Sequence, residues 1–137
     1  MSNNAQSEIL LQVNNLSVEF ITKSGLWGRN KHVLKAVDNF SFSIKKGQTV
    51  GLVGESGSGK TTAALAIARL IDANQGVVKM NSMDLLKIHG EELRQARTKL
   101  QFIFQDPYSS LNPRKRAEEI VREPLDSLTD FDLKTRN

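Results

Sequence analysis

One glycine-rich run constrains the fold of this chain more than any other feature of its sequence. It reads Gly54, Glu55, Ser56, Gly57, Ser58, Gly59, Lys60, Thr61 and Thr62. The run matches the P-loop pattern G-x-x-x-x-G-K-S/T, which requires a strand before it and a helix after it. The apolar segment 49–53 (TVGLV) precedes the run, and the Ala- and Leu-rich segment 61–71 follows it. We therefore predict an α/β fold in which a phosphate-binding loop joins a strand at 49–53 to a helix at 61–71.

The residue types in this run suit a triphosphate. Gly57 and Gly59 allow backbone angles closed to other residues, so that successive N–H groups converge on the phosphates. A helix that starts near Lys60 adds its positive N-terminal end, and the Lys60 side chain adds a full charge. Thr61 offers a hydroxyl ligand to Mg²⁺, which prefers oxygen. The alternative, a Gly/Ser turn that precedes Lys and Thr by chance, does not account for the flanking order of elements. The loop alone leaves kinases, GTPases and helicases open.

The rest of the chain alternates between predicted strands and helices. Segments 9–20 and 33–44 have the alternation of half-buried strands, and Asn14-Asn15 interrupts the first as a turn or bulge. We expect a loop at 22–32 and a turn at 45–47. Further strands are predicted at 77–81 and 100–104 (LQFIF), and helices at 91–99 and 114–122, the latter ending before Pro124.

Composition excludes several classes of protein. Among 137 residues there is no cysteine, which rules out disulfides and thiolate catalysis. The net charge of +4 suits nucleotides, membrane surfaces or nucleic acid, although a plain solvated surface explains it as well. The polar start at Met1 to Gln6 lacks the pattern of a signal peptide. The most apolar helical stretch, 63–71, contains Arg69 and is too short to span a bilayer, so we expect no direct membrane span.

Two stretches resemble a known family. Residues 36–44, Gly47 and the run from 51 to 62 resemble the start of the ATP-binding subunits of ABC transporters. Residues 102–114 (FIFQDPYSSLNPR) resemble the peptide/nickel branch of importers, which includes the oligopeptide and dipeptide permeases. The resemblance implies ATP and Mg²⁺ as cofactors. It implies a P-loop NTPase core, incomplete in this chain, beside an N-terminal antiparallel β subdomain.

The resemblance also assigns roles to residues. Gly54 to Thr62 would hold the phosphates, with Lys60 acting in catalysis. Gln105 would be a catalytic and Mg²⁺-coordinating glutamine that senses the γ-phosphate; without the resemblance it reads as a solvated loop residue. Phe20 stands where an aromatic residue stacks on adenine, and its alternative is an ordinary core residue. The segment 106–114 would face the transmembrane permease subunits, and its alternative is a turn-rich linker.

The resemblance implies an organisation and a location. Residues 1–8 would be a polar tail, 9–104 the β subdomain and P-loop core, and 105–137 the Q-loop and the start of a helical subdomain. The full-length relative would energise peptide import as a pair of ATP-binding subunits on the inner face of the membrane, without nucleic acid. These 137 residues contain no LSGGQ signature, Walker B strand or switch histidine. The alternative is therefore a truncated, non-hydrolysing nucleotide-binding fragment that is marginally stable; a soluble P-loop kinase or GTPase is a third reading.

Overall fold

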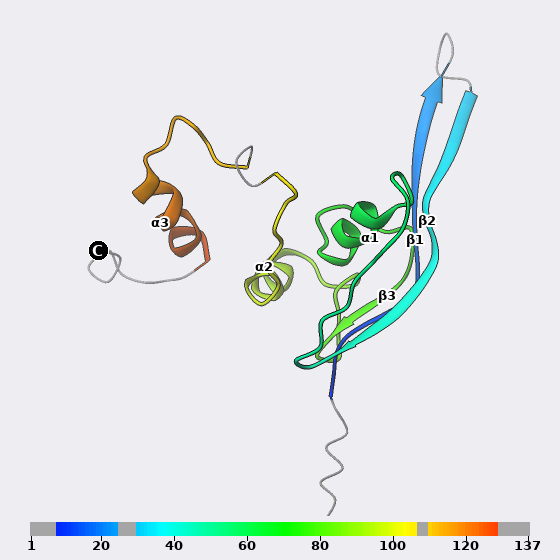
Figure 1. Cartoon of the computed structure of the whole chain (residues 1–137), viewed down its shortest axis with the longest axis horizontal. Coiled ribbons are helices and arrows are strands. Elements are labelled where there is room, and N and C mark those ends of the chain that lie inside the picture. The colour runs from blue at the N-terminus through cyan, green and yellow to red at the C-terminus, as the bar shows by residue number, and fades with distance from the viewer. Residues whose placement is uncertain (1–7, 25–29, 107–109, 129–137) are drawn as a thin grey trace, which may run out of the picture. The chain divides into compact units, whose positions relative to one another are not determined.

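The computed structural model describes residues 8–24, 30–106 and 110–128. The chain divides into two compact units, Met1–Ile88 and His89–Asn137. The described part of the first unit contains a sheet and one helix, and that of the second contains two helices (Figure 1).

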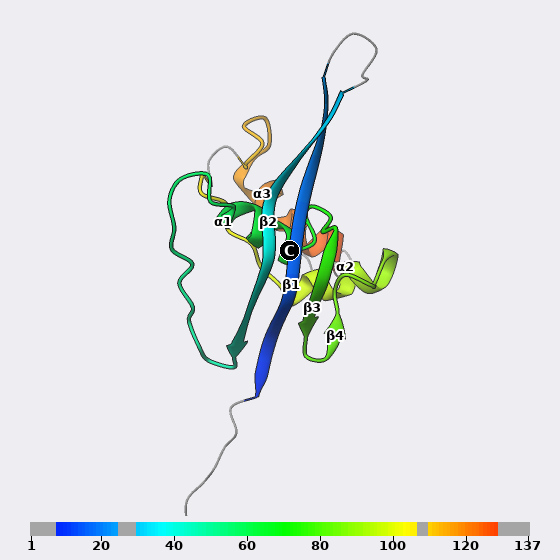
Figure 2. The ribbon, with the colours of Figure 1, turned by 90° about the vertical axis from the view of Figure 1, so that its right-hand side faces the viewer.

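The sheet of the first unit is antiparallel and has four strands in the order β2-β1-β3-β4 (Figure 2). The strands are β1 (Ile9–Ser24), β2 (Asn30–Lys45), β3 (Gln75–Met80) and β4 (Met83–Asp84). The predicted N-terminal antiparallel β subdomain is thus confirmed. The predicted loop at 22–32 is too long, because pairing of β1 with β2 extends to Ser24 and Asn30.

The predicted interruption of the first strand at Asn14-Asn15, as a turn or a bulge, is confirmed and is a bulge. The register shifts between Val13 and Leu16, and Asn15 has a left-handed φ of 50°. The Asn15 N–H donates to Ser41 Oγ at 2.8 Å. Asparagine tolerates this conformation better than most residues, and the serine hydroxyl replaces the lost ladder bond.

The core of the first unit lies where the sheet meets helix α1 (Lys60–Ile67). Its largest fully buried side chains are Leu16, Val13, Val18 and Val78. Such side chains each stabilise a fold by about 1.5–3 kcal/mol when fully buried. Helix α1 contributes Ala63 and Ala66, whose small side chains allow the helix to approach the strands closely.

Two predicted strands are wrong. Segments 49–53 and 100–104 are irregular, and none of the described strands pairs with either. Their apolar side chains are exposed, to 93% at Val53 and 87% at Ile103. A strand exists only through hydrogen bonds to a neighbour, so an apolar run without an available neighbour does not form one.

The three predicted helices are present in the structure, and two of them end at other residues than predicted. Helix α1 ends at Ile67 rather than at Ile71, because Arg69 adopts a left-handed φ of 58°. Helix α2 (Gly90–Thr98) agrees with its prediction. Helix α3 (Ala117–Leu128) does not stop before Pro124, which lies inside it. Proline removes one backbone hydrogen bond and disfavours helix at the preceding residue, but it does not always end the helix.

In α2, the side chain of Arg94 changes the pKa of the Glu91 carboxyl. Arg94 donates to both carboxylate oxygens of Glu91, at 2.7 and 2.8 Å. This hydrogen bond, together with the charge of the guanidinium, lowers the pKa of the Glu91 carboxyl.

None of the helices in the described part of the chain has the length and apolar character that crossing a bilayer requires.

Candidate nucleotide-binding site

The loop that leads into α1 has the backbone that the sequence predicts. Gly57 has a φ of 83°, and Gly59, the N-cap of α1, has a φ of 87° and a ψ of 4°. Both angles are in the left-handed region that glycine adopts without cost. The first turn of α1 therefore begins directly after the loop, with its N–H groups at the open end of the helix.

Gly59 also lies against the sheet. A Cβ atom added to Gly59 would overlap the carbonyl oxygen of Ala36 on β2, and it would lie 3.5 Å from Val37 Cγ2. The backbone of the loop thus contacts the backbone of the hairpin with no room for a side chain. This contact fixes the start of α1 relative to β2.

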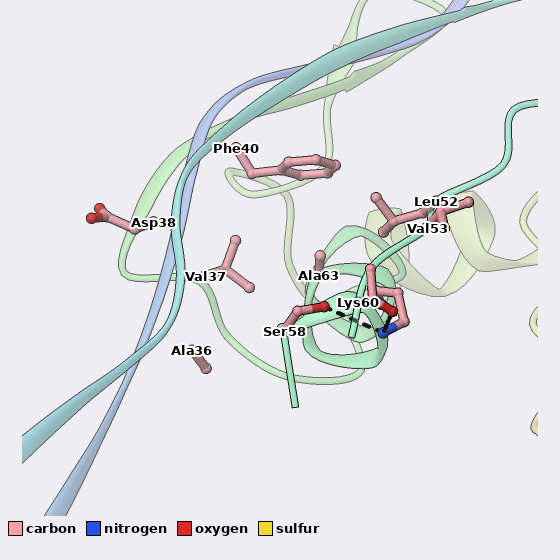
Figure 3. Close-up of a pocket in the computed structure, with 11 residues that line it drawn as sticks. Ala36, Val37, Asp38, Phe40, Leu52, Val53, Ser58, Lys60 and Ala63 are labelled. Atoms are coloured by element: carbon pink, nitrogen blue, oxygen red, sulfur yellow. Dashed lines mark hydrogen bonds between the residues drawn. The ribbon is translucent and has the colours of Figure 1, made fainter. Parts of the chain in front are cut away.

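The ammonium of Lys60 is held inside the curl of the loop. It donates to the carbonyl oxygens of Gly54 and Glu55, at 2.8 and 2.6 Å. It also donates to Ser58 Oγ at 3.2 Å (Figure 3). A flexible lysine is therefore placed at the N-terminal end of α1, where charge and helix dipole act together on an anion.

A cavity of about 320 Å³ connects this loop with the hairpin. Its lining comes from both: Phe20, Leu34, Lys35, Ala36, Gly57, Gly59, Lys60, Thr61 and Thr62. The loop and the start of α1 contribute Lys60, Thr61 and Thr62 to this lining, and the hairpin contributes Phe20 and Leu34 beside Lys35 and Ala36. A ligand with an anionic end and a flat apolar end matches this distribution.

A second cavity, of about 280 Å³, shares Gly59 and Lys60 but is mainly apolar. Phe40 and Val37 point into it from β2, facing Ala63, whereas the Asp38 carboxylate points away (Figure 3). Leu52 is also part of its lining. Because few polar groups face this cavity, it suits a phosphate ligand less well than the first.

Phe20 is not a core residue. Its side chain is 43% exposed and lines the first cavity. The adjacent Glu19 N–H donates to Asn74 Oδ1 at 2.6 Å, which ties this part of β1 to the turn after α1. The core alternative for Phe20 is therefore wrong, and stacking on a base stays a prediction.

The remaining predicted site residues lie in the second unit. Gln105 is exposed and follows the irregular segment 100–104. Of the segment 106–114, residues 107–109 lie outside the described residues. The predicted role of Gln105 in catalysis and Mg²⁺ coordination stays a prediction.

Sequence reasoning missed Leu34. An exposed leucine on a strand carries no signal of its own. Its place opposite Phe20 depends on the register of the hairpin, which the bulge at Asn15 shifts. Only a correct prediction of the β1–β2 register would have placed Leu34 opposite Phe20.

Comparison with known proteins places this fold in a family. Residues 37–136 match the sequence model described as "ABC transporter". The chain belongs to the ABC transporter family. A solved structure titled "Dimeric structure of a post-hydrolysis state of the ATP-binding cassette MJ0796 bound to ADP and Pi" matches with a TM-score of 0.73 and 27% identity, covering 92% of this chain and 52% of that one.

Curated relatives are closer in sequence. The oligopeptide transport ATP-binding protein AppF of Bacillus subtilis (strain 168) is 40% identical over 97% of this chain and 41% of its own length. The oligopeptide transport ATP-binding protein OppF of Salmonella typhimurium (strain LT2) is 45% identical over 88% of this chain and 36% of its own length. The chain thus spans about two fifths of the length of these relatives.

Proposed function

We propose that this chain is the ATP·Mg-binding part of an ABC transporter ATPase subunit that energises peptide uptake across the cytoplasmic membrane. The observation that carries the proposal is the placement of Lys60 at the start of α1, beside a cavity whose other end is Phe20. AppF and OppF are oligopeptide transport ATP-binding proteins, and this similarity is the reason for proposing ATP as the nucleotide and peptides as the transported substrate.

In this proposal the residues around the cavity bind different parts of the nucleotide. The N–H groups of Gly57 and Gly59 and of the first turn of α1 hold phosphate oxygens, and Lys60 neutralises the charge between them. Phe20 stacks on the base. Stacking of a base on an aromatic side chain contributes about 1–3 kcal/mol.

The residues present fit Mg²⁺ bound with a nucleotide. Thr61 lines the cavity and supplies one hydroxyl. Among the residues that the structure describes, no group of three or more His, Cys, Asp or Glu side chains could hold a metal by itself. Mg²⁺ in such sites is held by few protein oxygens and by phosphate oxygens, which matches this donor set. When bound, Mg²⁺ supplies charge stabilisation at the phosphates; Gln105 is the second proposed ligand.

The proposed partners follow from the relatives. Transmembrane permease subunits would contact the segment 106–114. A second ATP-binding subunit would pair with this one, as in the dimeric solved cassette. The proposed location is therefore the inner face of the membrane, reached through partner subunits.

We further propose that these 137 residues bind ATP without hydrolysing it. The exposure of Leu52 and Val53 supports this, because none of the described strands pairs with the segment that leads into the P-loop. Phosphoryl transfer depends on positioning and charge stabilisation, so a strand segment without a pairing neighbour directly before the loop should lower the rate of hydrolysis strongly.

Thermal melts and phosphate release test the two parts of the proposal on one sample. ATP·Mg at a hundred times its dissociation constant should stabilise the chain by about 2.7 kcal/mol and raise its Tm by on the order of 10 °C. Phosphate release should stay at background. An unchanged Tm would contradict binding, and steady hydrolysis that Lys60→Ala abolishes would contradict the non-hydrolysing reading.

A further inference from the structure

The far end of the hairpin presents two apolar cross-strand pairs to solvent. In the register, Phe20 is opposite Leu34, and the next pair toward the tip is Ile21 opposite Val33. All four side chains are exposed, with Leu34 at 62% and Val33 at 56%. Neighbouring exposed apolar side chains of this kind often mark a binding surface.

The two pairs belong to opposite faces. Successive side chains of a strand alternate between faces, and residues directly opposite each other share one. The Phe20–Leu34 pair lines the cavity together with Thr61 and Thr62 at the start of α1. The Ile21–Val33 pair is not part of that lining. Exposure is therefore common to both pairs, but only one pair faces the nucleotide site.

The pair can cover more of a base than one aromatic ring. Directly opposed Cβ atoms are about 4.5–5.5 Å apart, so a ring and an aliphatic side chain at these positions form one continuous apolar surface. In the proposed function, Lys60 and the loop, which line the same cavity, hold the phosphates. A purine tethered to them would lie against both side chains.

We infer that Leu34 is a second base-contacting residue, which forms with Phe20 a two-residue apolar wall for the nucleobase. The inference rests on the proposed function, because it takes the ligand to be a nucleotide. It assigns to β2 a part in base binding, whereas the family resemblance implies such a part only for Phe20 on β1.

The test compares Leu34→Ala with Val33→Ala, using calorimetry with two probes. ATP·Mg carries phosphates and a base, whereas Mg·tripolyphosphate carries phosphates alone. Leu34→Ala should weaken ATP·Mg binding about fivefold, because apolar contact area is lost, and should leave tripolyphosphate unchanged. Val33→Ala, the matched control on the other face of the same strand, should change neither affinity.

Three further variants complete the design. Phe20→Ala should weaken ATP·Mg binding about tenfold and spare tripolyphosphate, while Phe20→Tyr keeps both. Leu34→Met, similar in volume, should bind like the parent. If Leu34→Ala fails to fold, Leu34→Gln replaces it with the same expected loss.

The outcomes separate the inference from the proposed function. Equal ATP·Mg affinity of Leu34→Ala and Val33→Ala would overturn the role of Leu34 while leaving the loop assignment intact. So would an equal loss of ATP·Mg and tripolyphosphate in Leu34→Ala, since that indicates damage to the loop. A parent chain that binds neither probe would overturn the proposed function itself.

Discussion

Gly59→Ala should weaken ATP·Mg binding by about a hundredfold or more, a loss of ~2.7 kcal/mol. Two costs add at this position. An alanine with the φ of 87° found at Gly59 is strained by about 1–2 kcal/mol. Its Cβ would also overlap the carbonyl oxygen of Ala36, so the loop or the hairpin must move. Either movement separates the phosphate end of the cavity from the base end, and calorimetry measures the loss.

Two other glycines serve as controls for Gly59→Ala. Gly57 has a φ of 83° and Gly47 a φ of 77°, and no atom lies within 4 Å of a Cβ added to either. Gly57→Ala therefore imposes strain in the loop without a clash, and Gly47→Ala imposes strain in a remote turn. The expected order of affinity loss is Gly59→Ala, then Gly57→Ala, then Gly47→Ala. Gly59→Ala binding as tightly as Gly47→Ala would contradict the contact with β2 as a requirement for binding.

Lys60→Ala should weaken ATP·Mg binding at least tenfold, about 1.4 kcal/mol or more. The substitution removes the charge at the start of α1 and leaves the carbonyl oxygens of Gly54 and Glu55 without their shared donor. Lys46→Ala is the matched control, because it changes the net charge equally on an exposed turn. Circular dichroism shows whether each variant keeps its fold. Equal affinity of the two variants would remove Lys60 from the site.

The local features of the loop were predictable because they depend on neighbouring residues alone. Glycine at 57 and 59 permits the left-handed angles that are found there, and Lys60 follows at the first position of the helix. The hairpin was predictable for the same reason, since alternation of apolar residues within each strand indicates which face is buried. Asparagine at 15 marked the bulge.

What failed depends on partners distant in the sequence. The apolar segments 49–53 and 100–104 have the composition of buried strands, but composition does not supply the neighbour that a strand needs. Leu34 was missed because cross-strand register is a property of two segments together. Pro124 lies inside α3 although the residue before a proline disfavours the helical conformation, which shows that a local preference was overridden.

The most direct test of the nucleotide site is an NMR titration that reports on each residue separately. Backbone amide chemical shifts of the ¹⁵N-labelled chain, followed by NMR during titration with ATP·Mg, report which residues meet the ligand. The site described above predicts the largest changes across 54–62, centred on Gly57, Gly59 and Lys60, with further changes at Phe20 and Leu34. Unchanged shifts across 54–62 at saturating ATP·Mg, or changes confined to segments outside this loop and hairpin, would contradict it.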